Sequence, residues 1–183
     1  MALFLVRHGR PVIERGRPAE EWQLDPSTYD DVWALREQLP TRAAWFSSPE
    51  PKALGTAQLL TDAAIGVLDG LGEHRRDATW FDDHAAVVRR AFADPRGQAH
   101  PGWEPLERCR RRVVACAAPI LTAHAAEDVV LVGHGTAWTL LASELTGEPP
   151  DLDRWATLAM PDLIVLARPG DDPDSWAVVT SPD

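Results

Sequence analysis

The chain alternates short apolar runs with longer stretches whose apolar residues recur at helical spacing. Two runs stand out, Leu3–Val6 and Val129–Val132, and each gives way abruptly to polar residues flanked by glycine. An apolar run of this length is typical of a buried strand. The same reasoning predicts strands at 3–6, 43–46, 65–71, 128–133, 163–167 and 176–180.

Helical spacing of apolar residues predicts helices between most of these strands, over 28–39, 53–64, 79–93, 106–120 and 136–146. We expect Pro119 to kink the fourth of these helices or to end it one turn early. The same helix carries four arginines, which favour a solvated helix face over an anion site: Arg108, Arg110, Arg111 and Arg112.

Strands that alternate with helices predict the α/β class, with a mostly parallel central sheet covered by helices on both faces as a three-layer sandwich. The last two strand candidates are separated by Pro169-Gly170-Asp171-Asp172, which predicts an antiparallel C-terminal hairpin. At 183 residues, with no repeat or linker, the chain 1–183 is predicted to be a single domain.

Composition narrows the range of partners. The net charge of −10 argues against nucleic acid or an anionic membrane as the partner, because both require a cationic surface. The apolar runs are too short to cross a bilayer, and the first strand begins too early to leave room for a leader, so we expect a cytoplasmic protein. Cys109 and Cys116 are expected to be core thiols rather than a disulfide or a metal site. The sequence does not indicate an oligomeric state.

The candidate chemistry lies where the two clearest strands end. Arg7, His8 and Gly9 follow the first strand, and His134 follows the 128–133 strand between two glycines. The carboxyl ends of parallel strands meet at one edge of a sheet, so the two imidazoles are predicted to share a site. A neutral imidazole is a good nucleophile and an arginine binds two oxygens of a phosphate, which suits transfer of an anionic group. The helix after Gly135 could direct free N–H groups at the same anion.

Four sequence blocks resemble the histidine phosphatase superfamily, also called phosphoglycerate-mutase-like, in their order and separation: Leu5-Val6-Arg7-His8-Gly9, Ser47 to Ala57, Leu71-Gly72-Glu73 and Val132-Gly133-His134-Gly135. The resemblance implies a phosphohistidine intermediate formed without a metal or cofactor. It implies that His8 is the nucleophile, that Arg7 and His134 bind the phosphate, and that Glu73 is the proton donor. A buried Glu73 beside a phosphate should have a raised pKa.

Several positions depart from the family pattern. Lys52 stands where the family generally has a second phosphate-binding arginine; it either binds the phosphate with looser geometry or faces solvent. Glu14 replaces a common asparagine and is expected to point away from the site. Arg10 is a further candidate cation. Glu73 could instead be a surface carboxylate beside Arg75 and Arg76, with Asp82 and Asp83 as substitutes.

These residues together predict a metal-independent phosphomonoester hydrolase that acts on a small phosphorylated substrate, with a phosphoprotein also open. The loops 10–27 and 94–103 are expected to wall its pocket. The alternatives are a phosphoglycerate-mutase-like phosphotransferase and a non-catalytic module that binds a phosphorylated ligand. His74, His84, His100 and His124 are interpreted as structural.

Overall fold

A computed structural model describes residues 1–168 and 175–179. The strands are β1 (Ala2–Arg7), β2 (Ala44–Ser47), β3 (Ile65–Val67), β4 (Val129–Gly133), β5 (Asp162–Ala167) and β6 (Ala177–Val179). The α-helices are α1 (Tyr29–Ala34), α2 (Pro51–Leu60), α3 (His84–Ala93), α4 (Leu106–Ala123), α5 (Gly135–Thr146) and α6 (Leu152–Thr157). Short 3₁₀ helices are η1 (Ala19–Glu21), η2 (Pro26–Thr28), η3 (Leu35–Gln38) and η4 (Asp69–Leu71).

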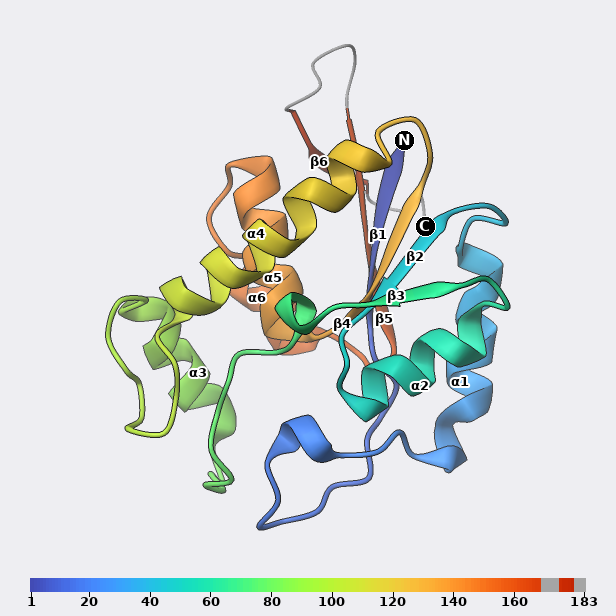
Figure 1. Cartoon of the computed structure of the whole chain (residues 1–183). Helices are drawn as coiled ribbons and strands as arrows, with labels where there is room; N and C mark the ends of the chain where they lie inside the picture. The colour runs from blue at the N-terminus through green and yellow to red at the C-terminus, as the bar shows by residue number, and fades with distance from the viewer. Residues whose placement is uncertain (169–174, 180–183) are drawn as a thin grey trace.

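The six strands form one sheet in the order β3-β2-β4-β1-β5-β6 (Figure 1). Strands β3, β2, β4 and β1 are parallel, whereas β5 runs antiparallel to both β1 and β6. The predicted α/β class, mostly parallel sheet and antiparallel C-terminal hairpin are therefore confirmed. The residues predicted to form the hairpin turn, 169–172, lie outside the described residues.

Alternating side chains divide the core between the two faces of the sheet. Leu3 and Leu5 of β1, with Leu131 of β4, pack on one face in a buried cluster that includes residues of α4 and α5. Val6 and Val132 pack on the other face with residues of α1 and α2. Figure 1 shows these helix pairs on opposite sides of the strands. Successive residues of a strand point to opposite faces, so near-continuous apolar runs produce the two core layers.

The register brings the predicted site residues to one edge of the sheet. Arg7 lies opposite Gly133 across the β1–β4 pair. One residue farther on, the backbone N–H of His8 donates to the carbonyl oxygen of Gly133 (2.9 Å), and the N–H of Ser48 donates to that of Val132 (3.0 Å). Strands β1, β2 and β4 therefore end at the same level, which places His8, Ser48 and His134 side by side.

Of the two effects expected of Pro119, an early end of helix α4 is wrong. The helix continues to Ala123, with Pro119 inside it. The residues after the proline, Ile120 and Leu121, are buried in the same core cluster as Ala117. Their burial outweighs the lost backbone hydrogen bond, because packing of an apolar face can override local propensity.

Other element boundaries also differ from the sequence prediction. The predicted strand 65–71 ends at Val67 and turns into η4, where Cys116 packs so closely that a Cβ on Gly70 would lie 2.5 Å from the cysteine Cβ. Helix α3 begins only at His84, because Asp83 caps it by accepting the backbone N–H of Ala86. Helix α6 was not predicted. None of the helices among the described residues has the length and apolar character needed to cross a membrane.

Candidate active site

His8 is held as a buried, neutral imidazole at the end of β1. The residue is only 6% exposed, and its Nδ1 is 2.7 Å from the carbonyl oxygen of Gly9. A carbonyl oxygen can only accept, so Nδ1 carries the hydrogen and Nε2 keeps its lone pair. Burial, followed by the nearby His134 and Lys52, holds the pKa of His8 well below its usual value. The imidazole is thus unprotonated near neutral pH.

His134 meets His8 as predicted. Their ring centroids are 5.2 Å apart in an edge-to-face arrangement, and His134 is fully buried. Its Nε2 lies 2.9 Å from the hydroxyl oxygen of Ser48. Burial lowers the pKa of His134, although Glu50 and Glu73 oppose that effect. The predicted proximity of the two histidines is confirmed, whereas their chemical roles stay predictions.

Lys52 is buried and does not face solvent. Its Nζ donates to a carboxylate oxygen of Glu50 and to the carbonyl oxygen of Ala19, both at 2.5 Å. Its side chain is 5% exposed, and that of Glu50 is 10% exposed. The ammonium group, which belongs to a residue of α2, is therefore already paired with a carboxylate in the free protein.

Glu50 is a site residue that the sequence analysis missed. Its Oε1 lies 3.2 Å from Nε2 of His134 and accepts the backbone N–H of Glu73 (2.8 Å). Burial alone would raise the pKa of Glu50, but the neighbouring His134 and Lys52 and the backbone N–H of Glu73 outweigh burial, and the pKa lies below its usual value. The only available signal was a carboxylate two residues before Lys52, which resembles an ordinary surface residue at a helix start.

Glu73 is half-buried beside the N-terminus of α5 and is not the surface carboxylate of the alternative interpretation. Its Oε1 accepts the backbone N–H groups of His74 (2.8 Å) and Ala137 (3.1 Å), and its Oε2 accepts that of Thr136 (3.2 Å). The helix N–H groups that were predicted to face an anion are thus engaged by this carboxylate. The two residues considered as substitutes, Asp82 and Asp83, are exposed.

The pKa of Glu73 is low in the free protein. Burial acts to raise it, but Arg76, His134 and the backbone N–H of His74 together lower the pKa to about 2. Glu73 is therefore ionised at neutral pH before a ligand binds. The raised pKa expected beside a bound phosphate stays a prediction.

Arg7 lies between β1 and the segment after α6. Its Nη1 donates to the carbonyl oxygens of Leu158 (2.6 Å) and Ala159 (3.2 Å). Its Nε is buried and has no hydrogen-bond partner among the described residues. A Cβ on Gly135 would lie 3.3 Å from that Nε, so the glycine lets the guanidinium pack against the start of α5. Arg10 is exposed, and among the described residues its side chain forms no hydrogen bond or ion pair with the residues of the site.

Arg112 corrects the interpretation of the arginine-rich helix. Arg110 and Arg111 pair with Glu107 on the surface as expected, but the side chain of Arg112 is only 16% exposed. Its Nη1 donates to the carbonyl oxygens of Gly72 (2.8 Å) and Gly70 (3.2 Å), and its Nη2 donates to that of Glu73 (2.9 Å).

Arg112 also forms a buried ion pair with Glu104 (2.7 Å), whose Oε1 in turn accepts the backbone N–H of Arg75 (2.9 Å). Together the pair holds the backbone on both sides of Glu73. Its role was invisible in the sequence, because Arg112 belongs to the same charged run as its exposed neighbours.

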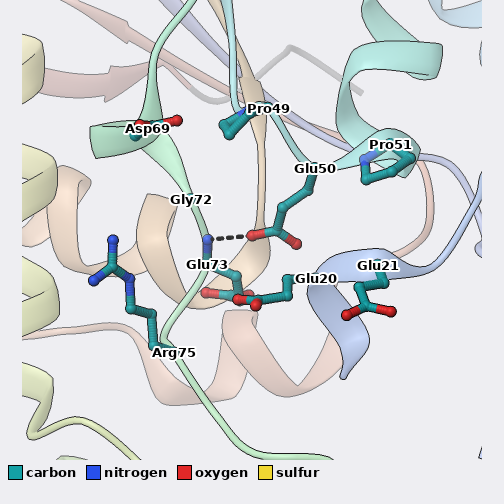
Figure 2. Close-up of a pocket in the computed structure, with 9 residues that line it drawn as sticks. All are labelled: Glu20, Glu21, Pro49, Glu50, Pro51, Asp69, Gly72, Glu73 and Arg75. Atoms are coloured by element: carbon teal, nitrogen blue, oxygen red, sulfur yellow. Dashed lines mark hydrogen bonds between the residues drawn. The ribbon is translucent and has the colours of Figure 1, made fainter. Parts of the chain in front are cut away.

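A cavity of about 320 Å³ opens beside Glu50 and Glu73 (Figure 2). Its lining carries one basic residue, Arg75, and five acidic residues: Glu20, Glu21, Glu50, Asp69 and Glu73. This cavity is therefore mainly acidic, and its lining does not include His8, His134 or Lys52. The loop 10–27 supplies two of its lining residues, Glu20 and Glu21, whereas none comes from 94–103.

The other residues considered in the sequence analysis lie outside the group formed by His8, His134 and their partners. Glu14 pairs with Arg17 (3.2 Å), as expected for a side chain that points away. His74 bonds to the carbonyl oxygen of Glu104 (2.6 Å), and His124 pairs with Glu127 (2.6 Å). Cys109 and Cys116 are free thiols packed in or against the core. In the described part of the chain, no group of three or more His, Cys, Asp or Glu side chains is arranged to hold a metal ion.

Comparison with known proteins yields one family and several similar folds. The family described as "Histidine phosphatase superfamily (branch 1)" matches residues 3–179. No curated protein matches the sequence. Mycobacterial glucosyl-3-phosphoglycerate phosphatase Rv2419c has a similar structure, with a TM-score of 0.75, 20% identity and coverage of 97% of this chain and 96% of that chain.

Two further solved structures are similar over nearly the whole chain. Bacillus stearothermophilus YhfR has a TM-score of 0.74 and 21% identity, covering 97% of this chain and 94% of that chain. The α-ribazole phosphatase of Shigella flexneri has a TM-score of 0.73 and 17% identity, covering 98% and 95%. At these identities the structures share the fold.

Proposed function

This chain belongs to the histidine phosphatase superfamily, and we propose that it is a metal-independent phosphomonoester hydrolase that works through a covalent phosphohistidine on His8. The observation that carries the proposal is the state of the His8 ring. Its Nδ1–H is engaged by the carbonyl oxygen of Gly9, which leaves Nε2 as the lone pair able to attack phosphorus. The family fold supports phosphohistidine chemistry of the phosphatase or mutase kind, and hydrolysis is the finer proposal.

In the first step, Nε2 of His8 forms a bond to phosphorus while the bond from phosphorus to the ester oxygen breaks. The electron pair of that bond goes to the leaving oxygen, which takes a proton from Glu73. Glu73 is ionised in the free protein, but the negative charge of a phosphate arriving beside it raises the pKa of a carboxyl. Arg7, His134 and Lys52 would stabilise the charge on the other oxygens.

In the second step, water attacks the phosphohistidine. Glu73 accepts the proton of that water, the N–P bond breaks, and inorganic phosphate leaves with His8 restored to its neutral form. The same group thus donates a proton in one step and accepts one in the next. The buried environment of His8 fits this cycle, because burial disfavours the cationic ring that could not attack.

The test is turnover of an aryl phosphate in the presence of a chelator, with His8→Ala as the comparison. We expect phosphate release by the native protein and a loss of at least 10³-fold in the variant, because the nucleophile is removed. Quenching in alkali should trap a phosphoprotein that is labile to acid. Full activity of His8→Ala would overturn the mechanism, and a requirement for a diphosphorylated primer would indicate a mutase instead.

A further inference from the structure

We propose that Glu50 is an internal anion that occupies the phosphate site of the free protein and that a bound phosphoryl group must displace it. The inference rests on the proposed function, because it concerns the residues to which that function assigns phosphate binding. It makes Glu50 a residue that sets phosphate affinity: its carboxylate competes with the substrate, and the competition determines how strongly the site holds an anion.

The first support is the identity of the groups that bind Glu50. One carboxylate oxygen accepts the ammonium of Lys52 at 2.5 Å. The other lies 3.2 Å from Nε2 of His134 and 2.8 Å from the backbone nitrogen of Glu73, which donates to it. Lys52 and His134 are two of the residues assigned to the phosphate. A carboxylate and a phosphate are both recognised by such donors, so one anion excludes the other from them.

The second support is burial. Glu50 is 9% exposed and Lys52 is 4% exposed, so water screens their attraction little. An exposed pair of this kind contributes almost nothing, whereas a buried pair strongly resists separation of its partners. Phosphate therefore cannot recruit Lys52 without working against Glu50.

The third support is the charge balance of the site. Two cationic side chains, Arg7 and Lys52, stand beside two ionised carboxylates, Glu50 and Glu73, while both histidines are neutral. The formal charges of these four side chains cancel, and Arg76 is a further cation that acts on Glu73. A phosphate is attracted more strongly when one carboxylate withdraws or is neutralised. Both carboxylates line the open cavity, and Glu50 is the one that contacts Lys52. Glu73 is held by three backbone N–H groups instead.

The other interpretation is that Glu50 only aligns Lys52 for phosphate binding. The two interpretations predict opposite effects of removing the charge. A competing anion weakens phosphate binding, so its loss tightens binding. An aligning partner strengthens phosphate binding, so its loss weakens it.

The experiment compares the binding of inorganic phosphate to the full chain and to Glu50→Gln by calorimetry at neutral pH. The glutamine has the same shape but no charge. We expect Glu50→Gln to bind phosphate at least tenfold more tightly. Inhibition of aryl phosphate turnover by vanadate should tighten in the same direction.

The matched control is Glu20→Gln, which removes a charge from the lining of the same cavity but not from the contacts of Lys52 and His134. We expect its phosphate affinity to change less than threefold. Thermal unfolding shows whether each variant folds, and Glu50→Ala replaces Glu50→Gln if the latter does not.

Unchanged or weaker phosphate binding by the folded Glu50 variant would overturn the inference, as would an equal gain in Glu20→Gln. Absence of phosphate binding in every variant would overturn it as well. These outcomes are separate from a failure of the proposed function, which is judged by turnover in chelator and by His8→Ala. Phosphate affinity can be measured whether or not the protein turns over an ester.

Discussion

The carboxylate of Glu73 accepts the backbone N–H of Ala137 at 3.1 Å, so the proposed proton donor also caps the N-terminus of α5. The two residues lie 64 positions apart in the chain. Helix N-termini favour a negative charge, which explains how a half-buried carboxylate remains ionised there. The proposed mechanism requires Glu73 to carry a proton, so substrate binding must change the environment of its carboxylate.

Glu73→Gln should separate the chemical role of this residue from its structural one. Glutamine retains an acceptor for the helix N–H groups but cannot donate a proton to the leaving oxygen in the same way. We expect kcat/KM, which reports the first chemical step, to fall by about 10² or more for an alkyl phosphate, within the usual range for general acid catalysis. The fall in kcat/KM should be much smaller for a nitrophenyl phosphate, whose leaving group needs little protonation. An equal fall in kcat/KM for both esters would argue against the proton-donor role.

Glu73 should also make stability depend on pH. The pKa lies at about 2 in the folded protein and near 4.5 in the unfolded chain. The folded state therefore binds fewer protons, and the contribution is present above pH 4.5 and is lost as the pH falls toward 2. It amounts to about 3 kcal/mol. Urea unfolding between pH 6 and pH 3 should show a steeper decline for the native protein than for Glu73→Gln; parallel declines would contradict the low pKa.

Arg112→Lys tests whether the arginine positions Glu73. Lysine keeps the charge but lacks the planar group that reaches the carbonyl oxygens of Gly70, Gly72 and Glu73 together. We expect a larger loss of kcat/KM for an alkyl phosphate than for a nitrophenyl phosphate, because a displaced Glu73 protonates the leaving oxygen poorly.

Arg111→Lys is the matched control for this change, since Arg111 lies on the same helix with a side chain that is 74% exposed. It should leave the ratio of the two rates unchanged. A purely structural role of Arg112 would reduce both rates together and would lower the melting temperature without altering that ratio.

Gly133→Ala should destabilise the protein by crowding the end of β4. A Cβ there would lie 2.6 Å from Cζ2 of Trp138, whose indole N–H donates to the carbonyl oxygen of Val6 (2.8 Å) and so fixes the ring. Overpacking of this kind costs about 1–3 kcal/mol.

Gly55→Ala offers the opposite sign, because Gly55 lies inside α2 and the nearest atom to an added Cβ is 3.5 Å away in Leu24. Alanine there should stabilise the helix by about 0.5–1 kcal/mol. Chemical denaturation of both variants measures the two changes. A Gly133→Ala variant as stable as the native protein would contradict the packing described at Trp138.

Much of the fold could be predicted from the sequence, because the patterns that indicate strands and helices are local. The apolar runs at β1 and β4 are long enough to mark buried strands, and the helices between them show one apolar face each. Packing decided the boundaries instead. Pro119 stays inside α4 because Ile120 and Leu121 are buried beyond it, which no local rule could show.

The proximity of His8 and His134 could be predicted from the sequence alone, because the ends of parallel strands align and each histidine directly follows its strand. The partners of those side chains were decided only by the tertiary structure. Glu50 and Arg112 are charged residues on helix starts and faces, where most such residues are solvated, and their burial depends on segments far away in the chain. Residue type and spacing report local geometry, whereas the charge of a site is set by which distant groups are buried together.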